Sequence, residues 1–149
     1  MVIGLAFWLL TLSTCAYAWT RGGRDGRLAA GLILGASLLS VPATLIGAHW
    51  ARTEQAVFVI DIALLAGLYA LALRSQRYFV IWLAGLHLVA VISHMSTLLA
   101  PDFAPRIYRA LSNFWAVPMS LVMFFGIRAD VRSAFLGNGI GDASQDPTT

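Results

Sequence analysis

Apolar runs of about twenty residues alternate with short polar segments along this chain of 149 residues. The clearest run, residues 78–100, contains no Asp, Glu, Lys or Arg. A helix of this length spans about 34 Å, which exceeds the roughly 30 Å hydrocarbon core of a bilayer. The pattern predicts an all-α fold, an integral membrane bundle of five transmembrane helices at residues 2–19, 28–48, 55–73, 78–100 and 107–127.

Composition favours a membrane protein over a soluble one. Hydrophobic residues make up 59% of the chain and charged residues only 11%, whereas soluble domains carry about 25% charged residues. All ten basic residues are Arg, and they form no dense stripe of the kind that binds nucleic acid. The expected partners are the lipid bilayer and either a second copy of the chain or a larger membrane complex. Cys15 is the single cysteine, so no disulfide forms within the chain.

The first apolar run has one feature of a secretory signal peptide, because Ala16-Tyr17-Ala18 has the form of a cleavage triplet. Signal peptides begin with basic residues. No Lys or Arg precedes the run at residues 2–19. We therefore expect a retained first helix.

The arginines predict the orientation of the helices. With the N-terminus outside, the segments 20–27 and 74–77 and the C-terminal tail hold seven Arg, and the outer loops hold three. Basic residues favour the cytoplasmic side of a membrane. We expect a multi-pass protein of a bacterial inner membrane, with its N-terminus outside and its C-terminus inside. The helical domain is expected at residues 1–136, and residues 137–149 have the composition of a polar disordered tail.

Four of the predicted helices carry a polar or irregular residue at nearly the same depth. Each lies six residues from the outer end of its helix, about 9 Å deep: Asp61, His94, Asn113 and Pro42. An Asp that faced lipid would cost about 2.5–3.5 kcal/mol. We therefore expect Asp61 and His94 to face each other inside the bundle, with Asn113 beside them.

Two further residues are expected to extend this polar layer inward. His87 precedes His94 by seven residues, so two helical turns place both on about the same face. Tyr69 lies on the third helix at a depth comparable to that of His87. We expect a ladder of His94, His87 and Tyr69 toward the middle of the membrane.

Small residues and prolines predict how the helices pack. Gly31 and Gly35 form a GxxxG pattern, which lets two helix backbones approach closely. Pro42 lacks the N–H of a helical hydrogen bond and is expected to kink its helix, and Pro118, near the middle of the fifth run, is expected to influence helix packing.

Three functions are open on these residues. The first is a non-enzymatic accessory or assembly subunit of a membrane complex, in which the polar layer fixes helix packing and Gly31 and Gly35 contact a partner. The second is a proton or small-ion pathway in which Asp61 and His94 exchange charge. The third is a haem- or pigment-binding membrane subunit with His94 or His87 as the ligand.

Catalysis and metal binding have no support in the sequence. The patterns Gly-x-Ser-x-Gly and His-Glu-x-x-His are absent, and these mark common hydrolase and zinc sites. No spacing of His, Cys, Asp and Glu offers three converging zinc ligands. We expect a non-enzymatic protein without a catalytic residue or a metal site, and without a cofactor unless His94 or His87 holds haem or a pigment.

Two stretches resemble known membrane proteins. Residues 61–94, DIALLAGLYALALRSQRYFVIWLAGLHLVAVISH, resemble small multi-pass bacterial proteins of no assigned activity. They share an Asp-led apolar helix, an Arg-rich turn and a His-bearing helix, and this resemblance implies the fold and no activity. Ala90-xxx-His94 resembles the pigment-binding helices of bacterial antenna proteins, which implies a pigment magnesium at His94.

Overall fold

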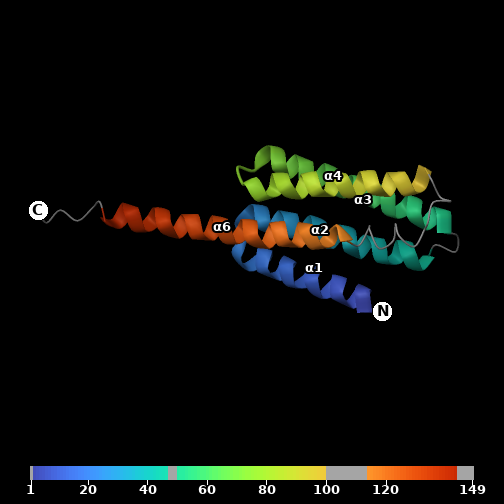
Figure 1. Cartoon of the computed structure of the whole chain (residues 1–149), viewed down its shortest axis with the longest axis horizontal. Coiled ribbons are helices and arrows are strands. Elements are labelled where there is room, and N and C mark those ends of the chain that lie inside the picture. The colour runs from blue at the N-terminus through green and yellow to red at the C-terminus, as the bar shows by residue number, and fades with distance from the viewer. Residues whose placement is uncertain (1, 47–49, 100–113, 144–149) are drawn as a thin grey trace, which may run out of the picture.

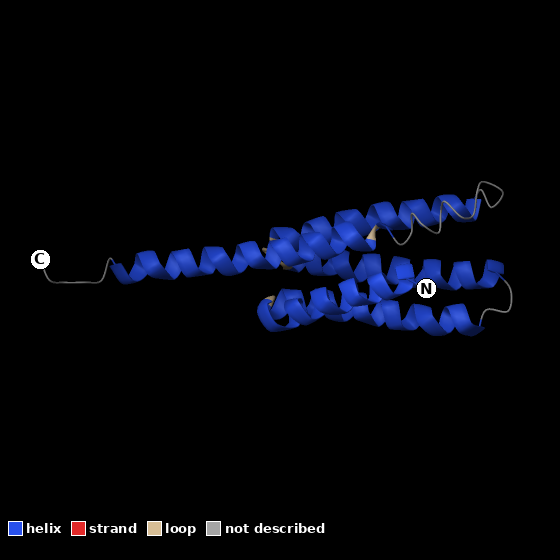
Figure 2. Ribbon diagram, turned by 60° about the horizontal axis from the view of Figure 1, so that its bottom comes forward, coloured by secondary structure: helices blue, strands red, loops and turns tan. Residues whose placement is uncertain are grey.

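The computed structural model describes the backbone of residues 2–46, 50–99 and 114–143 and the side chains of residues 5–41, 55–96 and 114–133. Within these ranges the fold is all-α and contains no strand (Figure 2). Five helices are present in the described part of the chain: α1 (Val2–Arg21), α2 (Gly23–Ile46), α3 (Trp50–Arg74), α4 (Tyr78–Leu99) and α6 (Ala116–Ala143).

The helices form a closed ring in which each one contacts two neighbours. The main contacts join α1 to α2, α2 to α3, α3 to α4, α4 to α6 and α6 back to α1. Short turns make α1 and α2 antiparallel, and the same holds for α3 and α4 (Figure 1). Both turns lie at one end of the bundle, which we call the turn end; the N-terminus lies toward the opposite end.

A very short turn joins α1 to α2, where the sequence predicts a loop over residues 20–27. The Gly22 N–H donates to the Ala18 carbonyl at 2.8 Å, and Gly23 has a φ of +61°. A Cβ at Gly22 would lie 2.5 Å from the same carbonyl oxygen, and side chains disfavour positive φ. Glycine therefore fits both positions, and the two helices extend into the charged segment before the chain reverses.

Helix α6 continues well past the predicted fifth span at residues 107–127. It begins at Ala116 and runs to Ala143, and its C-terminal part extends beyond the bundle at the turn end (Figure 1). Residues 137–143 are thus helical, although we predicted a tail from residue 137. Each glycine there costs about 1 kcal/mol of helix propensity, but no proline breaks the helix before Pro147. Residues 107–113 and 144–149 lie outside the described residues.

The half of the bundle nearest the turn end is closely packed. Leu68, Val80, Leu83 and Ile127 have no exposed surface, although they come from α3, α4 and α6. Gly126 lies so close to Phe79 that a Cβ there would overlap the Phe79 side chain. Contact between α4 and α6 therefore depends on the absence of a side chain at this position.

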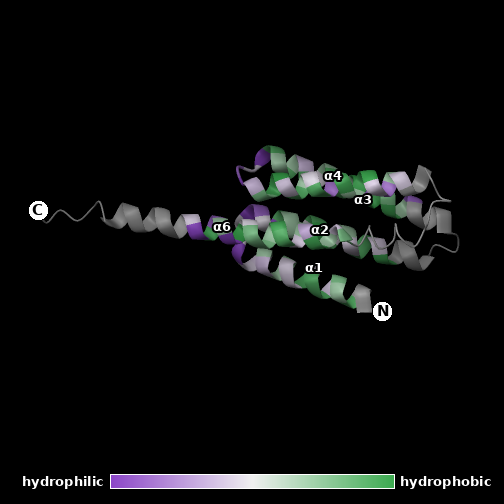
Figure 3. Ribbon diagram, viewed as in Figure 1, coloured by the Kyte–Doolittle hydropathy of each residue, from purple (hydrophilic) through white to green (hydrophobic). Residues whose placement is uncertain are grey.

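Two of the described helices contain a stretch that is long and apolar enough to cross a membrane. These stretches are Gln55–Arg74, with a mean hydropathy of 2.4, and Tyr78–Ser96, with a mean hydropathy of 1.8. Large hydrophobic side chains are exposed on every helix, whereas hydrophilic residues gather at the turn end (Figure 3). Among the exposed side chains are Leu9, Leu39, Leu73, Trp82 and Phe125.

Candidate functional site

A cavity of about 360 Å³ lies inside the ring, in the half away from the turn end. Every described helix contributes to its wall. Each described helix places at least one polar residue in the wall, and examples from the five helices are Thr11, Ser37, Asp61, His94 and Ser120. A polar cavity of this size lies within the range of small-molecule sites, about 300–1,000 Å³.

Asp61 and His94 form the strongest polar contact in the cavity wall. The Asp61 Oδ2 and His94 Nδ1 atoms are 2.8 Å apart, and the ring of Phe58 meets the His94 ring edge-on at 5.5 Å. A carboxylate can only accept, so His94 Nδ1 carries the proton and donates it. The side chains of Asp61 and His94 are 28% and 13% exposed, so the pair is largely shielded from solvent.

His87 lies two helical turns before His94 on α4 and also contacts Asp61 of α3. This ring is 5% exposed, and its Nε2 lies 3.0 Å from the backbone carbonyl oxygen of Asp61. Because a carbonyl accepts, His87 Nε2 is the donor. Because the two histidines are seven residues apart on α4, both face α3. His87 contacts the backbone of Asp61, and His94 contacts its side chain.

The hydroxyl groups in the wall are partly used within their own helices. Thr14 donates to the Leu10 carbonyl at 2.7 Å, and Ser40 donates to the Ala36 carbonyl at 2.9 Å. Such bonds satisfy a hydroxyl inside an apolar helix bundle. They leave the oxygen lone pairs as acceptors toward the cavity.

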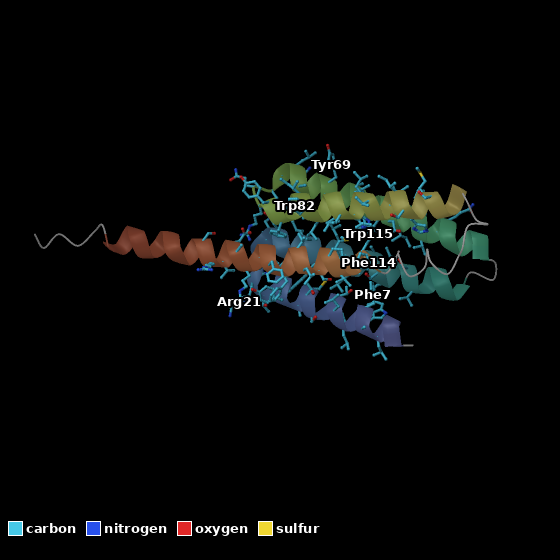
Figure 4. The ribbon with its side chains drawn as sticks, in the orientation of Figure 1. Phe7, Arg21, Tyr69, Trp82, Phe114 and Trp115 are labelled. Atoms are coloured by element: carbon cyan, nitrogen blue, oxygen red, sulfur yellow. The ribbon has the colours of Figure 1, made fainter. Side chains whose placement is uncertain are left out.

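Trp115, just before α6, brings a buried donor to the same wall. Its Nε1 atom is buried and has no hydrogen-bond partner among the described residues, and its side chain lines the cavity. Figure 4 shows Trp115 in the interior of the bundle, between the helices. Buried donors in proteins are nearly always paired, so this N–H is an exception among the described residues.

The structure does not bring Tyr69 to the site. This side chain is 60% exposed and projects from the outer face of the bundle (Figure 4), where it lines an apolar groove between α3 and α4 with Ile62 and Leu88. The eight residues between Asp61 and Tyr69 rotate the side chain by roughly 80° around the helix. The predicted ladder of His94, His87 and Tyr69 is therefore wrong at Tyr69. A comparable depth along the helix does not place two side chains in contact unless both also point toward each other.

The remaining predicted residues fall in different places. Asn113 lies outside the described residues, and so does the side chain of Pro42, although the α2 backbone continues through it to Ile46. Pro118 is the third residue of α6, in the first turn, where proline is tolerated without a kink. A Cβ on Gly31 or on Gly35 would meet nothing within 4 Å, so neither glycine packs against another helix of this chain.

A second polar cluster, at the turn end, was missed by the sequence analysis. Arg77 Nη1 donates to Asp130 Oδ2 and to the Gly22 carbonyl, both at 3.2 Å, and its Nε lies 3.8 Å from Asp25 Oδ2. Ser75 Oγ donates to Asp25 at 2.7 Å. The signal for it was the basic turn at residues 74–77 in a chain with seven acidic residues, but the pairing requires the fold.

The described residues contain no group of three or more His, Cys, Asp and Glu that could hold a metal ion. Cys15 lines the cavity, and its Sγ lies 3.9 Å from the Ala30 carbonyl oxygen. Ligation of haem or a pigment by His94 or His87 stays a prediction. The site can hold a proton between Asp61 and His94.

Comparison with known proteins adds nothing to this description. The chain matches no family model, no curated protein and no solved structure. The resemblance of residues 61–94 to small bacterial membrane proteins therefore stays an expectation, and function rests on the geometry of the cavity.

Proposed function

We propose that this chain is a five-span bacterial inner-membrane protein and a non-enzymatic binding subunit whose central cavity receives a small molecule. Exposed Leu, Val, Phe and Trp side chains on every helix support a lipid environment, because lipid favours them over water. The seven Arg expected inside belong to the turn end and to the α6 segment next to it, which supports an inward-facing C-terminus.

One observation carries the proposal: the cavity is lined by every described helix and holds a polar pair inside an otherwise apolar ring. Polar side chains within membrane helices are costly and mark functional sites. Here Asp61 and His94 hydrogen-bond to each other, and the wall also contains the hydroxyl groups of Thr11, Ser37 and Ser120. This arrangement favours a binding role because it keeps a shaped polar surface where packing alone would have closed the ring.

A cavity-filling variant tests this function. Ala90 lines the cavity, so Ala90→Phe places a ring inside it, whereas Ala63→Phe adds the same ring to an exposed position of α3. The purified protein in detergent is heated with a panel of membrane-soluble small molecules, and stabilisation reports binding. We expect at least one compound class to raise the unfolding temperature of the parent and of Ala63→Phe, but not of Ala90→Phe.

Two outcomes would contradict this proposal. One is a panel in which no compound stabilises the parent protein. The other is a stabilising compound that acts equally on Ala90→Phe, since binding would then occur outside the cavity.

A proton-exchange site is the second candidate, favoured by the 2.8 Å contact between Asp61 and His94. The packed half near the turn end, with Leu68, Leu83 and Ile127 fully buried, offers no polar continuation among the described residues. The test is proton flux into vesicles that contain the protein and a pH-sensitive dye. An Asp61→Asn protein that conducts like the parent would remove this candidate.

An assembly role is compatible with the binding function. Gly31 and Gly35 present an open surface on α2, and small residues are typical of contacts between membrane helices. The accessory subunit would then hold its ligand within a larger complex or a homo-oligomer.

A further inference from the structure

The hydrogen-bond donors of the cavity wall are used to a greater extent than its acceptors. Two histidine N–H groups already donate to Asp61: His94 Nδ1 to the carboxylate at 2.8 Å and His87 Nε2 to the backbone carbonyl at 3.0 Å. The hydroxyls of Thr14 and Ser40 donate to carbonyls of their own helices, so their oxygens can only accept from a further partner. The bonded groups of the wall therefore leave mainly acceptors for a molecule in the cavity.

The strongest of these acceptors is the second carboxylate oxygen of Asp61. Oδ2 accepts from His94, whereas Oδ1 has no hydrogen-bond partner among the described residues. Trp115 Nε1 is the one buried side-chain polar atom without a partner in the described part of the chain, so Oδ1, which also lacks a partner, has exposed surface. Val57 and Leu64, four residues before Asp61 and three after it, line the cavity as well, so this face of α3 borders the cavity. A donor inside the cavity can therefore reach Oδ1.

The charges of the wall favour a cation over an anion. Among the described residues that line the cavity, Asp61 is the only carboxylate and there is no Arg, and the chain has no Lys. An anion would find no guanidinium or ammonium partner there, whereas a cation would form a charge-assisted hydrogen bond with Oδ1. Such bonds are roughly twice as strong as those between neutral groups. The hydroxyl oxygens of the wall provide the further acceptors that a buried cation needs.

Aromatic side chains and the size of the cavity favour an organic cation. Phe7 and Trp8 of α1 and Trp115, just before α6, line the cavity, and α1 and α6 are the two ends of the ring farthest along it from α3. The faces of aromatic rings attract cations, and those of Trp do so most strongly. A volume of about 360 Å³ is far larger than a bare metal ion requires and lies in the range of small molecules.

We propose that the cavity binds a small, lipid-soluble organic amine in its protonated form, with an N–H of the ammonium group donating to Asp61 Oδ1. This inference rests on the proposed binding function and names its ligand class. His94 holds Oδ2 and thereby orients the carboxylate, and His87 holds the backbone of the same residue. The aromatic side chains contact the rest of the cation.

Two matched probes and two matched carboxylate variants test the proposal. The probes are 2-phenylethylamine and 2-phenylethanol, which have nearly the same size and differ in charge at neutral pH. Binding is measured by equilibrium dialysis against the protein in phosphatidylcholine nanodiscs, whose lipid has no net charge, with empty nanodiscs as the blank. Asp61→Asn removes the charge and keeps the shape of the side chain. Asp25→Asn is the control, because Asp25 belongs to the turn end and lies outside the cavity wall.

The expected result is tighter binding of the amine than of the alcohol. Asp61→Asn should weaken amine binding about ten- to a hundredfold, the equivalent of one hydrogen bond to a charged group, and leave alcohol binding nearly unchanged. Asp25→Asn should leave the binding of both probes unchanged. Alcohol binding by Asp61→Asn also shows that this variant is folded and keeps its cavity.

The outcomes separate this inference from the function beneath it. Equal binding of both probes by the parent, or amine binding that Asp61→Asn leaves unchanged, overturns the amine assignment while the cavity remains a binding site. An equal loss of amine binding in Asp25→Asn also overturns it, since the effect would then report the net charge of the protein. Stabilisation by other compounds but not by the amine has the same meaning.

A panel in which no compound stabilises the parent, the amine included, overturns the proposed function together with this inference. If Asp61→Asn fails to fold, Ala90→Phe replaces it, because its added ring fills the cavity. Amine binding that survives in Ala90→Phe overturns the assignment.

Discussion

The two halves of the bundle are built from similarly apolar helices, yet one half is closely packed and the other contains a cavity with polar side chains in its wall. Toward the turn end, Leu68, Leu83 and Ile127 are fully buried, and the charged residues gather at the rim. In the other half a cavity of about 360 Å³ separates the helices, and polar side chains face inward. Packing fills the interior of the first half, whereas the second half keeps a cavity lined in part by polar side chains.

Their two charged clusters differ in the same way. Arg77 and its partners Asp25 and Asp130 are 36%, 25% and 34% exposed, so water screens them and each contact contributes little. His94 is only 13% exposed, whereas Asp61, at 28%, is about as exposed as the carboxylates of the turn end, but both residues of this pair have mostly apolar neighbours in the cavity wall. Loss of one partner there leaves a polar group that is poorly hydrated, which is costly. The cluster around Arg77 at the rim of the turn end (the rim cluster) therefore joins the α1–α2 and α3–α4 turns to α6, whereas Asp61 and His94 form part of the cavity wall.

The largest expected effect concerns the difference in packing between the two halves of the bundle. Leu83→Ala empties a fully buried position and should lower the free energy of unfolding by about 2 kcal/mol or more. Leu64→Ala is the matched change at a buried residue that also lines the cavity, so that part of its side chain borders open space. We expect Leu64→Ala to lower the free energy of unfolding by less than half as much as Leu83→Ala does. Unfolding in denaturing detergent measures both, and equal losses would show that the two halves are packed alike.

A smaller effect is expected at the turn end. Arg77→Ala removes the contacts to Asp25, Asp130 and the Gly22 carbonyl, and should cost about 1–2 kcal/mol because the cluster is partly exposed. The loss should shrink at high salt, since screening weakens exposed charges. Arg74→Ala is the control, because Arg74 is an exposed neighbour that makes no side-chain hydrogen bond or ion pair with the described residues. A cost equal to that of Arg74→Ala would contradict a joining role for Arg77.

The smallest effect on the single chain is expected on the open face of α2. Replacement of Gly31 and Gly35 by Leu meets no atom within 4 Å of either added Cβ, so the unfolding temperature should hold or rise slightly with helix propensity. Oligomer size in mild detergent, measured by light scattering, should fall if this face contacts a partner. An unchanged oligomer would remove the assembly role of the two glycines.

The positions of four helices could be predicted from the sequence because their apolar runs are long and polar segments bound them. The contact between Asp61 and His94 also followed, because each polar side chain in lipid needs a partner at its own depth. Tyr69 was misplaced because depth says nothing about rotation around the helix axis. The prediction for residues 137–143 rested on composition, which does not exclude a continuing helix.

The cavity and the rim cluster could not be predicted in this way. A cavity depends on the summed volumes of side chains from five helices, and no single run contains that information. Arg77 reaches residues 52 positions before it and 53 after it, so its partners emerge only from the closed ring.

A double-mutant cycle on Asp61 and His94 tests the central claim most directly. The free energy of unfolding in detergent is measured for the parent, Asp61→Ala, His94→Ala and the double variant. If the two side chains bind each other inside the ring, the single effects will not add, and the coupling free energy will be about 1–3 kcal/mol. Additive effects, with a coupling below about 0.3 kcal/mol, would contradict the claim.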